Sequence, residues 1–257
     1  MCLILIAINQ HARYPLVVVA NRDEFHTRPA TPMDFWPQAP SLLAGRDLQA
    51  GGTWLGITRQ GRFAAVTNVR EPGLNRSDAL SRGELPLQYL AGTLTASQYL
   101  AELQARAQSY NGFNLLCGTL AQVLHFSNRV EAPTALGSGV HGISNAVLDT
   151  PWPKVTTGKA ALAAVLSQPD FELDDLLPVL NQRAAAPDAS LPDTGVGLAM
   201  ERILSSRFIN APELAYGTRA STVLRVSNQG QVQVKEWSWN DQGALAGLRH
   251  YDFMLES

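Results

Sequence analysis

The sequence predicts an α+β protein built as a four-layer α/β/β/α sandwich of antiparallel sheets. Segments 2–8 and 16–20 are apolar on both alternating faces, as in strands that another layer covers on each side. Paired strand signals recur along the chain, and helical patterns lie between them, which favours sheet packed on sheet with helices outside. A plain α+β domain is the alternative architecture.

Short polar connections join the predicted strand pairs. Residues 9–15 join the first two strands, and Asn228-Gln229-Gly230 separates the last pair. Such connections predict hairpins and therefore mainly antiparallel pairing. The further pairs are 53–58 with 62–68, 113–118 with 122–127, and 218–227 with 231–239.

Three segments carry helical patterns that predict outer layers. Thr95 and Gln98 have the spacing of a capping box, and further patterns cover 154–167 and 197–208. The proline-rich stretch 29–40 is expected to be an ordered surface crossing. No linker interrupts the chain, so residues 1–257 are expected to form a single domain.

The composition limits the classes of partner. A chain of 257 residues with a formal net charge of -2 has no basic footprint for nucleic acid. Its two cysteines are too few for a disulfide framework, which favours the cytoplasm.

The apolar run 2–8 is too short to span a bilayer, so no stable membrane insertion is expected. The five histidines lack ligand spacing, so no metal site is predicted, and the oligomeric state stays open.

Cys2 is the most informative position for chemistry. Removal of the initiator methionine turns it into a residue that carries both a thiol and a free α-amine. An α-amine titrates at about 7.7–8.0 and accepts a proton near working pH, whereas a thiol titrates at about 8.5 and serves as nucleophile. The alternative is an inert terminal cysteine. Cys117 lies in a predicted apolar strand, where a thiol is ordinary packing.

The tetrapeptide Asn21-Arg22-Asp23-Glu24 follows the second predicted strand directly. In an extended chain Asn21 and Asp23 share one face, and Arg22 points to the other. These polar groups would then lie beside the end of the first strand. A solvated turn is the alternative for so short a polar cluster.

An ordered series of blocks gives a specific resemblance that runs from the first residue to at least Val226. The chain resembles the NRDE family, also called the transport and Golgi organisation protein 2 family. The blocks are Met-Cys at the start, Ala20 to Phe25, Gly51-Gly52-Thr53-Trp54-Leu55-Gly56, Thr67-Asn68, Gly142 to Asn145, and Tyr216-Gly217-Thr218-Arg219.

That family in turn is similar to the N-terminal nucleophile hydrolases with cysteine, such as bile salt hydrolases and acid-ceramidase-like amidases. The resemblance implies an N-terminal nucleophile hydrolase-like fold. It also implies catalytic roles for Cys2 as nucleophile, Asp23 at the α-amine, Asn68 and Asn145 as oxyanion donors, and Arg219 beside the thiol. One departure is that Ala20 stands where those hydrolases usually carry an arginine, and Arg22 is not its positional equivalent.

Asn21, Arg22 and Trp54 are the expected substrate-binding residues, although core packing is the common fate of a tryptophan in a strand. The resemblance implies a hydrolase that acts on an acyl amide or thioester through Cys2 and needs no cofactor. The alternative is a non-catalytic carrier of haem, acyl-CoA or lipid on the same fold, with His26 as the axial ligand to test for haem. The expected partner is a small acyl molecule in either case.

Overall fold

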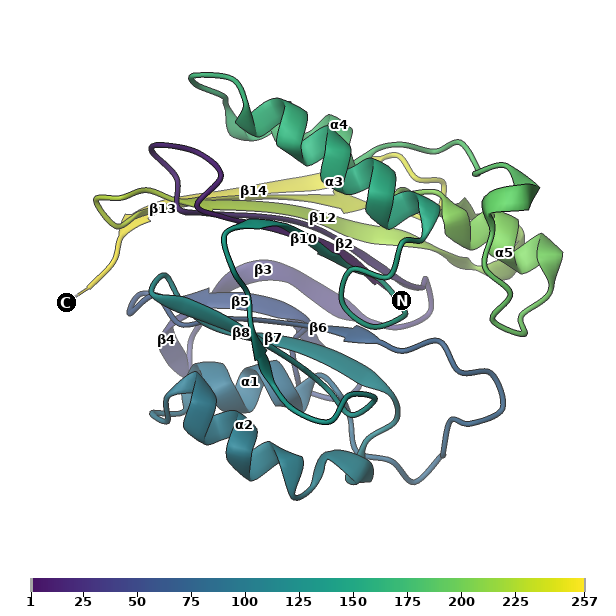
Figure 1. Cartoon of the computed structure of the whole chain (residues 1–257), viewed down its shortest axis with the longest axis horizontal. Helices are drawn as coiled ribbons and strands as arrows, with labels where there is room; N and C mark the ends of the chain where they lie inside the picture. Colours follow the sequence, from purple (N-terminus) through teal and green to yellow (C-terminus); the bar gives the residue numbers. More distant parts are fainter. Residues whose placement is uncertain (1, 257) are drawn as a thin grey trace.

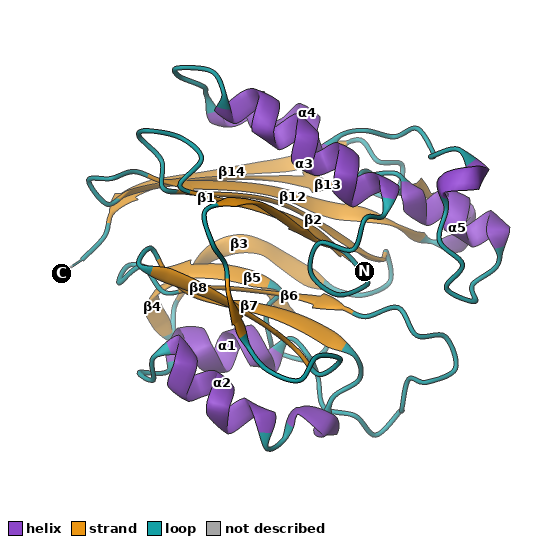
Figure 2. Cartoon of the chain, viewed as in Figure 1, coloured by secondary structure: helices purple, strands orange, loops and turns teal. Residues whose placement is uncertain are grey.

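The computed structural model describes residues 2–256 and consists of two antiparallel sheets packed face to face, with helices on both outer sides (Figure 1). Figure 2 shows the four layers in order: helices, sheet, sheet, helices. The predicted α/β/β/α sandwich is therefore confirmed.

The first sheet contains both strands of the N-terminal hairpin. Its strand order is β10-β1-β2-β12-β13-β14, and β11 pairs with β12 at one end. The strands are β1 (Cys2–Ile8), β2 (Leu16–Phe25), β10 (Gly139–Ile143), β11 (Asn210–Ala211), β12 (Tyr216–Val226), β13 (Gln231–Trp239) and β14 (Leu245–Met254).

The second sheet follows the chain order from β3 to β9. Its strands are β3 (Ala30–Trp36), β4 (Ala39–Asp47), β5 (Leu55–Thr58), β6 (Phe63–Asn68), β7 (Phe113–Thr119), β8 (Gln122–Ser127) and β9 (Thr134–Ala135). The stretch 29–40 was expected to cross the surface, but most of it belongs to β3 and the start of β4. Pro32 is tolerated there because β3 is an edge strand.

The helices divide between the two outer layers (Figure 1). Helices α1 (Glu84–Ala91) and α2 (Ala96–Gln104) cover the second sheet, and Thr95 and Gln98 form the predicted capping box. Helices α3 (Pro153–Leu166), α4 (Leu177–Leu180) and α5 (Leu198–Ser205) lie on the side of the first sheet. Short 3-10 helices cover Ala107–Ser109, Leu173–Leu176, Asp188–Ser190 and Pro212–Leu214.

Three apolar layers hold the sandwich together. Ile4 and Ile6 of β1 pack between the two sheets, whereas Leu3 and Leu5 pack against the helices over the first sheet. A third layer joins the second sheet to α1 and α2. Because β1 is covered on both faces, both of its alternating sets of side chains are apolar.

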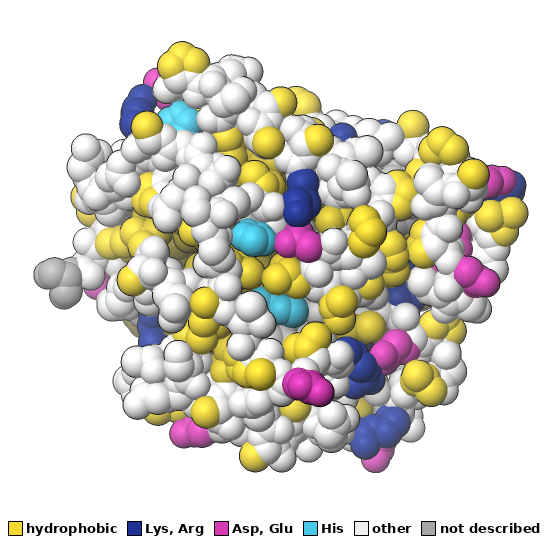
Figure 3. Space-filling view, viewed as in Figure 1, with side chains coloured by type: hydrophobic (Ala, Val, Ile, Leu, Met, Phe, Trp, Pro, Cys, Tyr) yellow, Lys and Arg dark blue, Asp and Glu magenta, His cyan; other side chains and the backbone are white. Residues whose placement is uncertain are grey.

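The surface shows no strong charge bias on the face drawn in Figure 3, where basic and acidic side chains are interspersed. Among residues 2–256, no helix is long and apolar enough to cross a membrane.

Truncation of Ile6 tests the layer between the sheets. Ile6 is fully buried there, so Ile6→Ala should lower the free energy of unfolding by about 2–5 kcal/mol. Urea denaturation measures this change. The control Leu214→Ala removes a side chain that is 42% exposed and should stay within about 0.5 kcal/mol of the wild type. Equal effects of the two variants would contradict the assigned layer.

Candidate active site

A cleft of about 390 Å³ lies where the N-terminal hairpin ends. Strands β1 and β2, the ends of β4 and β6, the loops that follow β2, β4 and β6, and the segment before β7 contribute its walls. The lining residues that bear on chemistry are Cys2, Arg22, Asp23, Trp54, Asn68 and Arg82. The sequence predicted eight catalytic or substrate-binding residues, and five of them line this cleft: Cys2, Arg22, Asp23, Trp54 and Asn68.

The first residue of β1 supplies the thiol. Cys2 lies opposite Arg22 in the register of β1 and β2, and its backbone carbonyl accepts a hydrogen bond from Ser144 at 3.1 Å. Burial raises the pKa of the Cys2 thiol, and the charge of the Asp23 carboxylate raises it as well, whereas Arg22 and a hydrogen bond from the Asp23 backbone amide lower that pKa. The Arg22 charge thus favours the thiolate, whereas burial and the Asp23 charge oppose it.

The polar tetrapeptide is part of strand β2 and not a solvated turn. Asn21, Arg22 and Asp23 are all buried. Val17 and Val19 of the same strand pack against the helices, whereas Val18 and Ala20 pack between the sheets. The alternation places Asn21 and Asp23 on the helix side and Arg22 on the side of the second sheet.

Asp23 is held by groups from other elements. The Thr218 hydroxyl donates to Asp23 Oδ1 at 2.7 Å and accepts from the backbone amide of Ile209 at 2.9 Å. Burial raises the pKa of the Asp23 carboxyl, and the charge of Lys154 acts in the opposite direction. Asp23 is therefore fixed in orientation at the edge of the cleft.

Asn21 does not reach the cleft as a substrate-binding residue. Its Nδ2 donates to the carbonyls of Leu180 at 3.1 Å and Arg207 at 2.7 Å. Its Oδ1 accepts from the Ser221 hydroxyl at 2.6 Å. Both ends of the side chain thus bind the protein itself and tie β2 to the helix layer.

Arg22 and Trp54 are brought together in the cleft wall. The Arg22 guanidinium carbon lies 4.4 Å from the centre of the Trp54 ring, a distance at which a cation interacts with the aromatic face. Arg22 Nη2 also lies 3.6 Å from Asp47 Oδ2. This buried cation is therefore positioned beside the thiol by a ring and a carboxylate.

The two asparagines lie next to each other but in different settings. Asn68 lines the cleft, and among residues 2–256 no side-chain hydrogen bond of Asn68 is formed. Asn145 is buried, and its Nδ2 donates to the Asn68 backbone carbonyl at 3.0 Å. Asn68 is the amide available to a ligand, whereas Asn145 supports the backbone that carries it.

Arg219 does not enter the cleft. It occupies a register shift between Thr218 and Ala220, where β12 bulges against β2. Its Nη1 donates to the carbonyls of Phe25 and His26 at 3.2 and 3.1 Å. Because the bulge re-aims the side chain, the arginine beside the thiol is Arg22.

His26 also lies outside the cleft. Both of its ring nitrogens are buried without a hydrogen-bond partner among the described residues, and the ring packs against Gly217. Burial lowers the pKa of His26. The ring presents no nitrogen to the cleft, so this geometry does not fit an axial ligand of haem.

The two glycines of the Gly51-Gly52-Thr53-Trp54 block are each required for a different physical reason. Gly51 has a φ of 76°, a conformation that side chains disfavour. A Cβ on Gly52 would lie 2.4 Å from the backbone of Gly83. Gly52 therefore lets the loop that carries Arg82 pack closely against the β4–β5 loop, which carries Trp54.

Sequence reasoning missed Lys154, which lies at the start of α3. Lys154 is 2% exposed, and its Nζ has no hydrogen-bond partner among residues 2–256. Burial lowers its pKa to about 8, and Asp23 acts against that shift. A lysine in a helical pattern normally lies in solvent, so the sequence carries no signal for this position. The sequence does carry a signal for Thr218, because this residue belongs to the family block Tyr216-Gly217-Thr218-Arg219.

Two antiparallel sheets between helices, with a cysteine at the start of the first strand, define an N-terminal nucleophile hydrolase-like fold. The structure is similar to that of a mutant conjugated bile acid hydrolase from Clostridium perfringens, with a TM-score of 0.50 and 9% identity. The match covers 98% of this chain and 97% of that chain, and at this identity it shows the fold alone.

The chain belongs to the Transport and Golgi organisation 2 family, whose sequence model matches residues 1–241. It is 38% identical to the Transport and Golgi organization protein 2 homolog of Bos taurus, over 88% of this chain and 87% of the relative. It is 35% identical to the Homo sapiens homolog, over 95% of this chain and 94% of the relative. The family resemblance seen in the sequence is confirmed.

The lowered pKa of Lys154 predicts how the free energy of unfolding changes with pH. Above pH 8 the folded protein releases the Lys154 proton, whereas the unfolded chain keeps it to its ordinary pKa of 10.5. The contribution of this group to the free energy of unfolding therefore rises with pH between about 8 and 10.5. The stability of the wild type relative to Lys154→Met should rise by about 1 kcal/mol per pH unit in that window.

Urea unfolding at pH 8.0 and pH 9.5 measures this difference. Lys159→Met is the matched control, because it removes a partly exposed lysine from the same helix and should change the pH dependence far less. A difference between wild type and Lys154→Met that is independent of pH would rule out the buried, titrating lysine.

Proposed function

We propose that the protein is a cysteine N-terminal nucleophile hydrolase that cleaves an acyl amide or thioester through Cys2. One observation carries the proposal: the Cys2 thiol, the Asp23 carboxylate and the unpaired Asn68 amide converge on one cleft. A nucleophile, a group that orients its base and an oxyanion donor are the parts that acyl transfer requires.

The first half of the reaction follows from these groups once Met1 has been removed. The Cys2 α-amine accepts the thiol proton, and the thiolate attacks the acyl carbonyl carbon. The Asn68 amide donates a hydrogen bond to the developing oxyanion. Collapse of the tetrahedral intermediate breaks the bond to the leaving group, and the ammonium returns its proton to the departing amine or thiol.

Water completes the cycle. The α-amine takes a proton from water, and the hydroxide attacks the thioester carbonyl of the acyl-enzyme. The carboxylic acid leaves, and the thiol recovers its proton from the ammonium. Asp23 holds the ammonium in position and stabilises its charge, because Thr218 fixes the orientation of the carboxylate.

Arg22 takes the role of cationic support for the thiolate. It lies directly across from Cys2 in the strand pair and lowers the pKa of the thiol. Its own position is fixed by Trp54 and Asp47. This arrangement offsets the absence of an arginine at position 20.

Intact-mass spectrometry with a panel of N-acyl amines and acyl thioesters tests the nucleophile. The wild type should lose Met1 and form an acyl adduct on Cys2 that decays with turnover, and Cys2→Ala should form no adduct. Cys117→Ala is the matched control, since this second thiol is buried and burial raises its pKa to about 12. It should react like the wild type.

Retained turnover in Cys2→Ala would overturn the proposal. Stoichiometric binding of acyl-CoA, lipid or haem that survives Cys2→Ala, without turnover in the wild type, would instead favour the carrier alternative.

Replacement of the oxyanion donor gives a second test. Asn68→Ala should lower kcat about 100- to 1000-fold with little change in the stability of the protein, as for other enzymes that lose one such donor. Steady-state kinetics with the substrate found by mass spectrometry and thermal unfolding together measure the two effects. An unchanged kcat would remove Asn68 from the reaction.

A further inference from the structure

The arginines that line the cleft are paired with carboxylates among residues 2–256, with one exception. Arg28 Nε lies 2.6 Å from Asp47 Oδ2 and 3.8 Å from Glu24 Oε2. Arg22 shares the same Asp47 carboxylate. Arg82 lines this cleft as well, yet no carboxylate among residues 2–256 lies within ion-pair distance of it.

The Arg82 guanidinium has most of its donors free. Its Nη1 donates to the Gly112 carbonyl at 3.1 Å, and this is its only hydrogen bond to residues 2–256. A guanidinium carries five N–H donors. Partial burial lowers the pKa of Arg82 from its ordinary value, but a guanidinium stays charged in proteins. A cation with free donors therefore lines the cleft beside Cys2.

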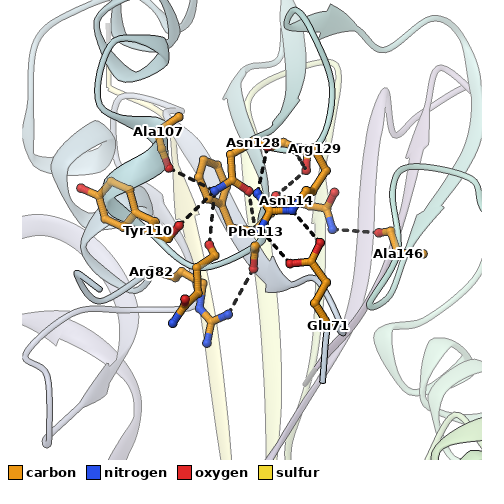
Figure 4. A network of polar contacts seen from close by, with 12 residues as sticks. Glu71, Arg82, Ala107, Tyr110, Phe113, Asn114, Asn128, Arg129 and Ala146 are labelled. Atoms are coloured by element: carbon orange, nitrogen blue, oxygen red, sulfur yellow. Dashed lines mark hydrogen bonds and ion pairs between the residues drawn. The ribbon is translucent and has the colours of Figure 1, made fainter. Parts of the chain in front are cut away.

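The nearby carboxylate of Glu71 is held by another arginine. Arg129 binds it through Nε at 2.6 Å and Nη2 at 2.7 Å. Figure 4 shows this pair beside Arg82. Glu71 lines the hollow that Arg82 shares with the cleft, but its two oxygens are used by Arg129. Glu24 and Glu71 attract Arg82 only from beyond ion-pair distance, so Arg82 has no carboxylate as a direct partner among residues 2–256.

The anchor of Arg82 is itself fixed. Gly112 precedes Phe113, whose backbone amide donates to Asn128 Oδ1 at 3.0 Å. Asn128 Nδ2 donates to the carbonyls of Ala107 at 3.0 Å and Tyr110 at 3.2 Å (Figure 4). The carbonyl that holds Arg82 belongs to a loop with satisfied polar groups, so the guanidinium is positioned before a ligand arrives.

The groups around Arg82 suit an anion. Ser77 and Ser81 line the same cleft and bring hydroxyl donors. A planar guanidinium binds a carboxylate or a phosphate through two parallel hydrogen bonds. Desolvation in the cleft strengthens such a contact.

We infer that Arg82 binds an anionic group, a carboxylate or a phosphate, of the acyl compound that enters the Cys2 cleft. That the ligand carries an acyl group rests on the proposed function, whereas the anion subsite does not. Arg82 is then a specificity-determining residue that selects charged over neutral substrates.

Binding to the full-length Cys2→Ala protein tests the subsite without any turnover. Isothermal titration compares a long-chain N-acylglycine with its neutral N-acylglycinamide, and an N-acylethanolamine phosphate with the neutral N-acylethanolamine. The anionic member of at least one pair should bind 10-fold or more tighter, and the pair that shows the preference identifies carboxylate or phosphate. Added salt should reduce that preference.

Substitutions of Arg82 in the same background assign the preference. Arg82→Gln should abolish it while leaving the neutral ligand bound as before, and Arg82→Lys should restore part of it. Arg76→Gln is the matched control, because Arg76 lies in the same loop with a half-exposed side chain paired with Asp78. It should keep the full preference.

Equal binding of the two members of both pairs, no binding of any of the four ligands, or an equal loss of anionic and neutral binding in Arg82→Gln would overturn the inference. The hydrolase proposal fails separately, if the wild type forms no acyl adduct. The two results are therefore distinguishable.

Discussion

The antiparallel pairing of β1 with β2 sets the layout of the cleft. In its register Cys2 lies across from Arg22, and the neighbouring side chains of β2 point to the opposite layer. The thiol and its cation therefore lie on the side of the second sheet, and Asp23 lies on the side of the helices. A slip of one residue would exchange these faces and carry Asp23 to the side of the second sheet.

Buried charge at the end of the sandwich is compensated separately in each layer. On the side of the second sheet, Trp54 and Asp47 hold Arg22. On the helix side, Thr218 and Lys154 act on Asp23. Since a buried charge is costly unless it is paired, these partners keep the polar residues of β2 in place where the apolar core ends.

The cleft is completed by the segment around Arg82 and not by the hairpin alone. Close contact between Gly52 and Gly83 packs this segment against the β4–β5 loop, which carries Trp54, and the Gly112 carbonyl fixes the guanidinium. The hairpin thus carries the thiol and the Asp23 carboxylate, and the segment adds an arginine that has no ion-pair partner among residues 2–256. In the function that we propose, the hairpin carries the chemistry and this segment selects the ligand.

The sequence alone determined the layered sandwich, the hairpins and the family, because apolar alternation and ordered motifs are local properties of the chain. It also showed that Asn21 and Asp23 share a face opposite Arg22. Since both faces of β2 are apolar before this point, the pattern does not tell which face meets the second sheet. Only the tertiary structure decided that Arg22 lines the cleft and Asn21 does not, that the β12 bulge turns Arg219 away, and that Lys154 is buried near Asp23. These placements depend on contacts between residues far apart in the chain, which no local pattern records.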